Sequence, residues 1–272
     1  IILSENRPFS METAACDEEY EPSSEYDSSF ALQIFAAREA VFKILAKESL
    51  SIHEKLIVIL DMGSKIQQCI NTDEYDNIKS VVNDYLKEGI AHTLDETRNL
   101  SDSGQFEDIS LQQGIRQILY PYEEMEVLNP EWEVILKDII DSLFEQMSDE
   151  EYNILNEEFG TYMVSRVYEY RQLLEYLVFR YFAKSIYDYD FLGKCQMLVT
   201  NFFVIRQMDI IRWLDNHREY SFKDRMDVVH IFSRQVEYSE DNIENLYEDF
   251  IFDDIFKTDS LIAILWIDSE NI

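Results

Sequence analysis

The residues best placed to do chemistry are charged side chains inside an otherwise apolar stretch of the chain. Arg206, Asp209 and Arg212 follow one another at three-residue steps among Phe, Val, Ile, Met and Trp, and Arg180 lies among equally apolar neighbours. Residues three apart on a helix are within side-chain reach, so Asp209 can pair with the arginine on either side of it. Charges in such a setting must pair or face a water-filled cleft.

A second group of polar residues follows in the stretch 221–240. His230, Arg234 and Glu237 step by four and then three positions, so they are predicted to share one helical face. Two interpretations stay open, namely a set of ion pairs that joins helices and a polar cleft that binds a ligand. The candidate cleft residues are Arg180, Arg206, Asp209, Arg212, His230, Arg234 and Glu237.

Basic residues gather between positions 166 and 234 of a very acidic chain. Such a local basic zone could hold an anionic ligand. It could equally balance the charge of surrounding carboxylates, and this second interpretation is slightly favoured.

The usual signatures of cofactor and metal sites are missing from the sequence. None of the six glycines forms a G-x-G-x-x-G turn, and Asp61-Met-Gly-Ser-Lys65 lacks the upstream glycine of a phosphate loop. Cys16, Cys69 and Cys195 are too far apart for metal-ligand spacing or a disulfide framework. We therefore predict no metal site, assign no catalytic residue and expect a reducing, cytoplasmic setting.

Composition and charge limit the partners of the chain. Its 272 residues include 55 acidic and 23 basic side chains, for a formal net charge of −32. A chain this acidic repels phosphate groups, so neither nucleic acid nor an anionic membrane is an expected partner. No unbroken apolar run approaches the length of about 18 residues that a membrane span needs. Six glycines and four prolines are few for this length, which favours helices.

The elements that must position the charged residues are two long helices between Thr161 and Arg218. Apolar residues recur there at three- and four-residue steps and spread beyond one face, as expected of buried helices. The sequence predicts that the two helices pack antiparallel and are joined near Tyr187–Asp190. We therefore expect an all-α fold, an irregular bundle of about ten helices around this central long hairpin.

Capping residues and breakers predict the ends of the other helices. Ser51 and Ser148 each precede a glutamate by three positions, and further caps are predicted at Asn129, Ser221 and Ser239. Three other predictions are a long exposed loop over 90–107, a helix that ends at Pro121, and a kink or break at Gly160. The apolar stretch Leu261–Ile267 is expected to form a docking helix rather than a strand.

The domain prediction is an acidic arm or linker over 1–29, followed by a helical domain over 30–272 that could divide into lobes 30–120 and 130–272. Because the first residue is not Met, we expect the chain to be part of a longer protein or an expressed piece of one.

Several helix-forming phrases resemble one known family, the flagellin lysine-N-methylases. Three phrases are similar to the C-terminal region of that family and two to its middle region, and the similarity as a whole covers about two thirds of the chain. They are Leu173-Leu-Glu-Tyr-Leu-Val-Phe-Arg-Tyr-Phe182, Val204-Ile-Arg-Gln-Met-Asp-Ile-Ile-Arg-Trp-Leu214, Phe232-Ser-Arg-Gln-Val-Glu-Tyr-Ser-Glu-Asp-Asn-Ile-Glu-Asn-Leu246, Ala37-Arg-Glu-Ala-Val-Phe-Lys-Ile-Leu45 and Ser51-Ile-His-Glu-Lys-Leu-Ile-Val-Ile-Leu60.

The resemblance implies a bacterial cytoplasmic enzyme that uses S-adenosylmethionine to methylate lysines of flagellin or another protein substrate. It also implies an N-terminal cysteine cluster that holds an iron–sulfur centre, and this chain lacks such a cluster. The cluster either precedes Ile1 in the native protein or has been lost, so the resemblance carries over no catalytic residue. The alternative is a non-catalytic helical module that binds a protein partner through its acidic surface.

Overall fold

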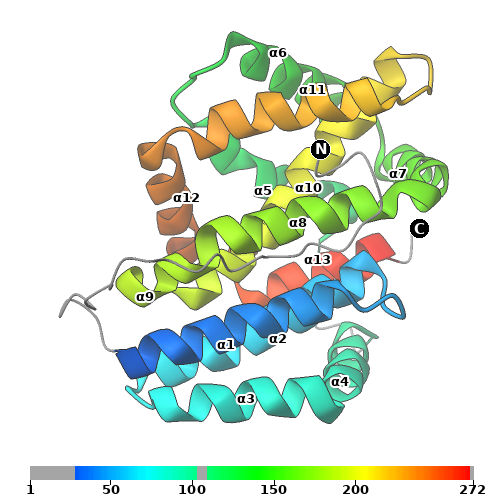
Figure 1. Cartoon of the computed structure of the whole chain (residues 1–272). Coiled ribbons are helices and arrows are strands. Elements are labelled where there is room, and N and C mark those ends of the chain that lie inside the picture. Colours follow the sequence, from blue (N-terminus) through cyan, green and yellow to red (C-terminus); the bar gives the residue numbers. More distant parts are fainter. Residues whose placement is uncertain (1–27, 103–108, 270–272) are drawn as a thin grey trace. The chain divides into compact units, whose positions relative to one another are not determined.

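The computed structural model describes residues 28–102 and 109–269, and every regular element in these ranges is helical (Figure 1). Within them, helix forms ten continuous runs, apart from the isolated 3-10 turn Asp254–Phe256. The predicted all-α class is confirmed. The predicted acidic arm lies outside the described residues, except for its last two positions, which begin the first helix. None of the described helices is long and apolar enough to cross a bilayer.

The chain divides into two compact units, and each is built from two separated stretches. The first unit combines Ile1–Leu94, described from residue 28 onward, with Arg166–Cys195, and the second combines Asp95–Ser165 with Gln196–Ile272. The predicted lobes follow the order of the chain, whereas these units interleave along it.

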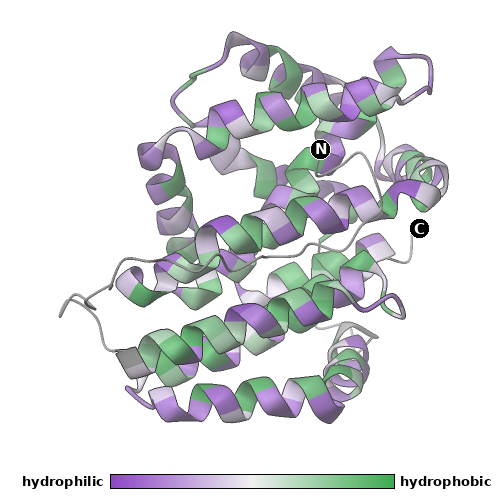
Figure 2. Ribbon diagram, in the orientation of Figure 1, coloured by the Kyte–Doolittle hydropathy of each residue, from purple (hydrophilic) through white to green (hydrophobic). Residues whose placement is uncertain are grey.

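In the first unit, α1 packs against α2, α3, α8 and α9. Figure 2 shows α1 as mainly hydrophobic with a few hydrophilic positions, as expected of a helix with neighbours on several sides. Most of its apolar side chains are buried, Phe30, Ile34 and Val41 among them. The helices of this unit are α1 (Ser28–Leu45), α2 (Ile52–Asn71), α3 (Ile78–Asp84), α8 (Val167–Tyr181) and α9 (Ser185–Asp188), with 3-10 turns at Tyr75–Asn77 and Phe182–Lys184 and a π turn at Tyr85–Gly89.

In the second unit, α5 packs against α7, α12 and α13, and α6 packs against α11. The unit contains α5 (Leu111–Glu123), α6 (Pro130–Ile139), α7 (Asp149–Met163), α11 (Phe222–Phe232), α12 (Glu240–Phe252) and α13 (Thr258–Ser269), with π turns at Ile140–Glu145 and Ser233–Glu237. The 3-10 turn Val164–Arg166 begins in the second unit and ends at the first residue of the next stretch of the first unit. Two helices, α4 (Ile90–Asp102) and α10 (Phe191–Asp215), begin in the first unit and continue in the second.

Helix α10 is the most deeply buried element of the second unit. Every residue from Gly193 to Ile211 is buried, including Phe202 and Ile205 at 3% and 4% exposure. The apolar spread along this helix therefore predicted its burial correctly. The proposed partner arm α8 belongs to the first unit, so the antiparallel packing of the two arms stays a prediction.

Helix starts agree with the predicted caps. Ser51, Ser148 and Ser221 form complete capping boxes, in which the hydroxyl accepts from the amide three residues on and the acidic side chain accepts from the cap amide. Asn129 and Ser239 also cap their helices. Ser110 forms a further box with Gln113, which was not predicted. The predicted docking helix near the end of the chain is confirmed as α13.

The predicted exposed loop over 90–107 is wrong for its first thirteen residues, which form α4; positions 103–108 lie outside the described residues. The π turn Tyr85–Gly89 carries the backbone from α3 directly into α4. The Thr93 side chain is buried and donates to Asp61 Oδ2 at 2.8 Å. A contact to a residue 32 positions away therefore overrides the local signals for a loop.

Two predicted breakers also fail to break their helices. Helix α5 continues through Pro121 to Glu123. Because Pro121 lies in the last turn, the N–H that the proline lacks removes a backbone hydrogen bond only there. Helix α7 continues through Gly160 to Met163, and the α-helical hydrogen bonding changes only at the 3-10 turn that follows. Burial of the side of α7 that carries Tyr152 and Phe159 compensates for the weak helix propensity of Gly160.

Candidate functional site

Arg206 joins three helices of the second unit and does not pair with Asp209. Its guanidinium donates to Asn156 Oδ1 of α7 at 2.7 Å, to Asp268 Oδ1 of α13 at 2.8 Å and to the Asn156 carbonyl at 3.2 Å. Arg206 and Asp268 are 3% and 0% exposed. The predicted Arg206–Asp209 pair is wrong because α10 is covered on all sides, so the neighbouring helices supply the partners.

Asp209 likewise bonds to residues outside its own helix. It accepts hydrogen bonds from the Tyr220 hydroxyl and from the Arg225 guanidinium, which also lies over the Tyr220 ring, 5.4 Å from its centre. Asp209 and Arg225 are both fully buried. The predicted Asp209–Arg212 pair is therefore also wrong. For Arg206 and Asp209, the structure agrees with the interpretation that ion pairs join helices.

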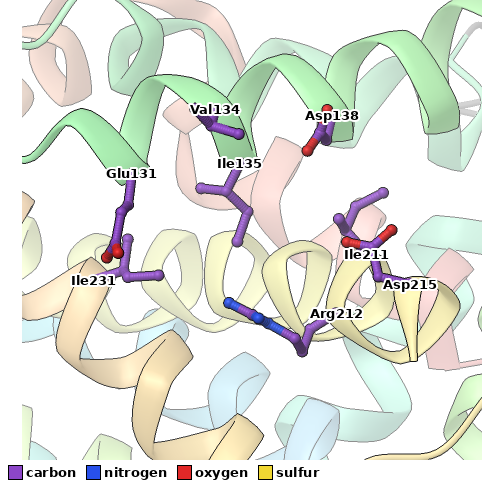
Figure 3. A pocket seen from close by; sticks show the side chains of 8 residues that line it. All are labelled: Glu131, Val134, Ile135, Asp138, Ile211, Arg212, Asp215 and Ile231. Carbon is purple, nitrogen blue, oxygen red and sulfur yellow. The ribbon is translucent and has the colours of Figure 1, made fainter.

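Arg212 lies in a different environment, at the edge of a pocket between α6, α10 and α11. This α6–α10 pocket has a volume of about 260 Å³, and Figure 3 shows Glu131, Ile135 and Asp138 directed toward α10, with the Arg212 guanidinium below Ile135. The lining residues are Glu131, Val134, Ile135, Asp138, Ile211, Arg212, Asp215 and Ile231. Of the seven candidate residues, only Arg212 lines this pocket.

The other candidates do not converge on it. His230 and Arg234 are exposed, whereas Glu237 is 7% exposed and buried. The predicted common face is wrong because the π turn Ser233–Glu237 inserts extra backbone into the helical turn and rotates Glu237 inward. Arg180 lies in the first unit, is exposed and donates to the hydroxyls of Tyr181 and Tyr176 at 2.9 and 3.4 Å. A ligand-binding role for any of the seven stays a prediction.

The basic zone of the sequence is extensively paired. Arg166 bonds to Glu169 and Arg171 to Glu175, both at 2.7 Å, and Lys194 lies 2.6 Å from Asp188. Together with the pairs of Arg206 and Arg225, these contacts agree with charge balance for surrounding carboxylates.

Sequence reasoning missed the partners of the buried charges. Asn156, Tyr220, Arg225 and Asp268 give no sign of their contacts in their own neighbourhood. Of these four residues, only Asp268 has a sequence context that indicates burial. It directly follows the apolar stretch Leu261–Ile267, just as the charges within α10 lie among apolar residues. A further buried hydrogen bond, from the Tyr122 hydroxyl to Asn201 Oδ1 at 2.8 Å, also went unpredicted.

The first unit contains a polar cluster around Asp61. This carboxylate accepts from Thr93, from Lys65 at 3.1 Å and from Tyr85. Burial and the hydrogen bond to Asp61 raise the pKa of Tyr85 to about 12. Burial alone would lower the pKa of Lys65, but its hydrogen bonds to Tyr85 and Asp61 raise it. Asp61 and Lys65 lie one turn apart within α2. Because the segment between them is helical, it does not form a phosphate-binding loop.

A second pocket, the α2–α3 pocket, adjoins this cluster. Its volume is about 560 Å³, and its lining is mostly polar, with two carboxylates, hydroxyls and amides beside the Lys65 amine. The lining residues are Lys65, Gln68, Cys69, Thr72, Glu74, Asn77, Ser80, Val81 and Asp84. Its volume lies within the range of about 300–1,000 Å³ that is typical of small-molecule sites, and seven of its nine lining residues are exposed, so it is an open polar groove.

The cysteines do not fit an iron–sulfur centre. A cluster of this kind is usually held by four thiolates, and the chain has three cysteines in all. Cys69 and Cys195 are buried, and burial raises the pKa of both thiols, so they stay protonated. Over 28–102 and 109–269, no group of three or more His, Cys, Asp or Glu side chains is placed to hold a metal ion.

The helical chain matches a known protein family over most of its length. The family described as the FliB lysine N-methylase C-terminal domain matches residues 38–264. The chain belongs to this family. The match extends over both compact units, and it confirms the resemblance stated from the sequence. No curated protein and no solved structure matches significantly.

Proposed function

We propose that the chain is the helical part of a bacterial, cytoplasmic protein-lysine N-methyltransferase that acts on flagellin, with S-adenosylmethionine as the methyl donor. The family match over residues 38–264 carries this proposal. Bound S-adenosylmethionine would supply an electrophilic methyl group: its methyl carbon–sulfur bond would break as the nitrogen of an uncharged lysine side chain forms a bond to that carbon, which leaves the thioether S-adenosylhomocysteine and releases one proton from the nitrogen. In this proposal, the role of the chain is to hold the two reactants together and to set the charge around them.

The α2–α3 pocket supports binding of the methyl donor in this chain. Its volume of about 560 Å³ lies within the range of about 300–1,000 Å³ that is typical of cofactor sites. S-adenosylmethionine carries a sulfonium, an ammonium and ribose hydroxyls. Glu74 and Asp84 can accept from the hydroxyls and attract the positive charges, and Asn77 and Ser80 offer further hydrogen bonds.

Isothermal titration calorimetry with S-adenosylmethionine tests this assignment. Asp84→Asn should weaken binding, whereas Asp76→Asn on the neighbouring 3-10 turn, which is exposed and outside the pocket lining, should not. Equal affinities for both variants would place the donor elsewhere.

The activity itself is tested by incubating the full-length gene product with flagellin and S-adenosylmethionine labelled in the methyl group. Mass spectrometry of flagellin peptides should then show labelled methyl groups on lysine. Label on another residue type, or none with an upstream segment present, would contradict the proposal. Flagellin that binds the chain without being methylated would favour the non-catalytic module, to which the net charge of −32 points.

A further inference from the structure

The lining of the α2–α3 pocket follows the same helical spacing on both of its walls. On the side of α2 it runs from Lys65 to Thr72, and on the side of α3 from Asn77 to Asp84, each with steps of three, one and three residues. Residues with this spacing share one helical face. Seven residues advance a helix by about 10 Å, so the pocket is a groove with two distinct ends.

The charged groups of the groove divide between these two ends. At one end, Lys65 Nζ donates to the Tyr85 hydroxyl at 2.7 Å, and Tyr85 directly follows Asp84 in the chain. At the other end, the Asn77 side chain donates to Glu74 Oε2 at 3.0 Å. Asn77 and Asp84 are the first and last lining residues of one wall. The groove therefore has a cation and a carboxylate at one end and a second carboxylate at the other.

The Lys65 amine is held in place by residues behind the lining. It donates to Tyr85, which is 4% exposed, and to Asp61, which also accepts from the buried Thr93. An ammonium has three donors, so one of them has no partner among the described residues. Burial alone would lower the pKa of Lys65, but these hydrogen bonds raise it, so the amine is charged at neutral pH. Lys65 is also the one cation among the nine lining residues.

We propose that Lys65 binds the carboxylate of S-adenosylmethionine and thereby fixes the direction in which the methyl donor lies in the α2–α3 pocket. The donor has a single carboxylate, on the same carbon as its ammonium, and the rest of the amino-acid part separates both from the ribose. With the carboxylate at Lys65, the ammonium lies at the end that contains Asp84, and the ribose hydroxyls lie toward Glu74. The identity of the ligand rests on the proposed function.

Decarboxylated S-adenosylmethionine gives the proposal a test of sign, because it lacks only the carboxylate. Lys65→Met removes the charge and keeps an unbranched stem, so it should weaken binding of S-adenosylmethionine by up to about fivefold, as expected for one partly exposed charge pair. The same substitution should leave binding of the decarboxylated ligand unchanged or tighten it, because that ligand is cationic throughout. A lysine that only stabilised the pocket would affect both ligands equally.

The experiment is isothermal titration calorimetry of the full chain with both ligands. The matched control is Lys79→Gln, an exposed position of α3 outside the lining, which should bind S-adenosylmethionine nearly unchanged. Lys65→Arg keeps the charge and should retain most of the affinity. Binding of the decarboxylated ligand by Lys65→Met shows that this variant is folded. An equal loss for both ligands, no loss for S-adenosylmethionine, or an equal loss in Lys79→Gln would overturn the proposal.

The two levels of proposal fail separately. If both ligands behave as expected but the full-length gene product does not methylate flagellin, the assignment of Lys65 stands and the proposed enzyme activity falls. If flagellin is methylated and Asp84→Asn weakens binding of S-adenosylmethionine while Lys65→Met does not, the donor site stands and the assignment of Lys65 falls. If the full chain does not bind S-adenosylmethionine, both pocket assignments fall, and the methylation assay alone decides the activity.

Discussion

Replacing Asp209 by alanine tests whether the charges on α10 are structural. Asp209 and Arg225 are fully buried, and the substitution removes the carboxylate that Arg225 and Tyr220 contact. Breaking a buried pair by removing one partner costs about 3–5 kcal/mol, because the remaining charge loses its compensation inside the protein. We expect a loss of that size in the free energy of unfolding, against a typical total of about 5–15 kcal/mol.

The measurement is urea denaturation, followed by both circular dichroism and tryptophan fluorescence so that coincident transitions verify two-state unfolding of a protein with two compact units. Arg212→Ala is the matched control, since Arg212 lies on the same helix but is only partly buried and makes no ion pair within the described residues. It should cost about 1 kcal/mol or less.

A double variant separates the charge effect from packing. Asp209→Leu/Arg225→Met replaces both buried charges with apolar side chains, so it should be more stable than Asp209→Ala. A loss below about 1 kcal/mol for Asp209→Ala, or an equal loss for Arg212→Ala, would show that the buried pair contributes no more than an exposed one. The account of α10 as a helix fixed by ion pairs to its neighbours would then be wrong.

Three further predictions concern backbone packing and pH. Gly63→Ala should lower stability by about 1–3 kcal/mol in denaturant unfolding, because the added Cβ would lie 2.5 Å from Cys195 Sγ, and Cys195→Ala should reduce that loss. His217→Gly should raise the melting temperature or leave it unchanged, because this exposed residue has a φ of 55°, which glycine adopts without strain; a clear decrease would contradict this. The folded-state pKa of Tyr85, about 12, exceeds the ordinary value of 10, so its contribution to stability is complete below pH 10 and is lost as the pH rises toward 12. The stability of Tyr85→Phe should therefore fall less steeply than that of the wild type over this interval.

Features set by neighbouring residues could be predicted from the sequence. A cap such as Ser51 or Ser221 needs only the side chain three positions later, so the pattern contains the whole interaction. The burial of α10 was also predictable, because apolar residues around its whole circumference leave no face for water. Both kinds of evidence are local to one helix.

The partners of the buried charges were not predictable by the same means. Arg206 meets Asp268 62 positions later, and Asp209 meets Arg225 16 positions later. The three-residue spacing correctly identified side chains that could reach one another, but burial of α10 brought other helices closer with better geometry. Periodicity indicates that a buried charge needs a partner, and only the packing of helices selects it.

Regular spacing also fails where the backbone departs from the α-helix. Glu237 follows His230 by seven positions, which would place both on one face, yet the π turn between them rotates Glu237 into the interior. The pocket residues of α6 avoid this error, because Glu131 and Asp138 both precede the π turn at Ile140–Glu145. Their spacing of seven therefore does place them on one face of α6, two turns or about 10 Å apart along the helix, so both line the α6–α10 pocket because that part of the helix is regular.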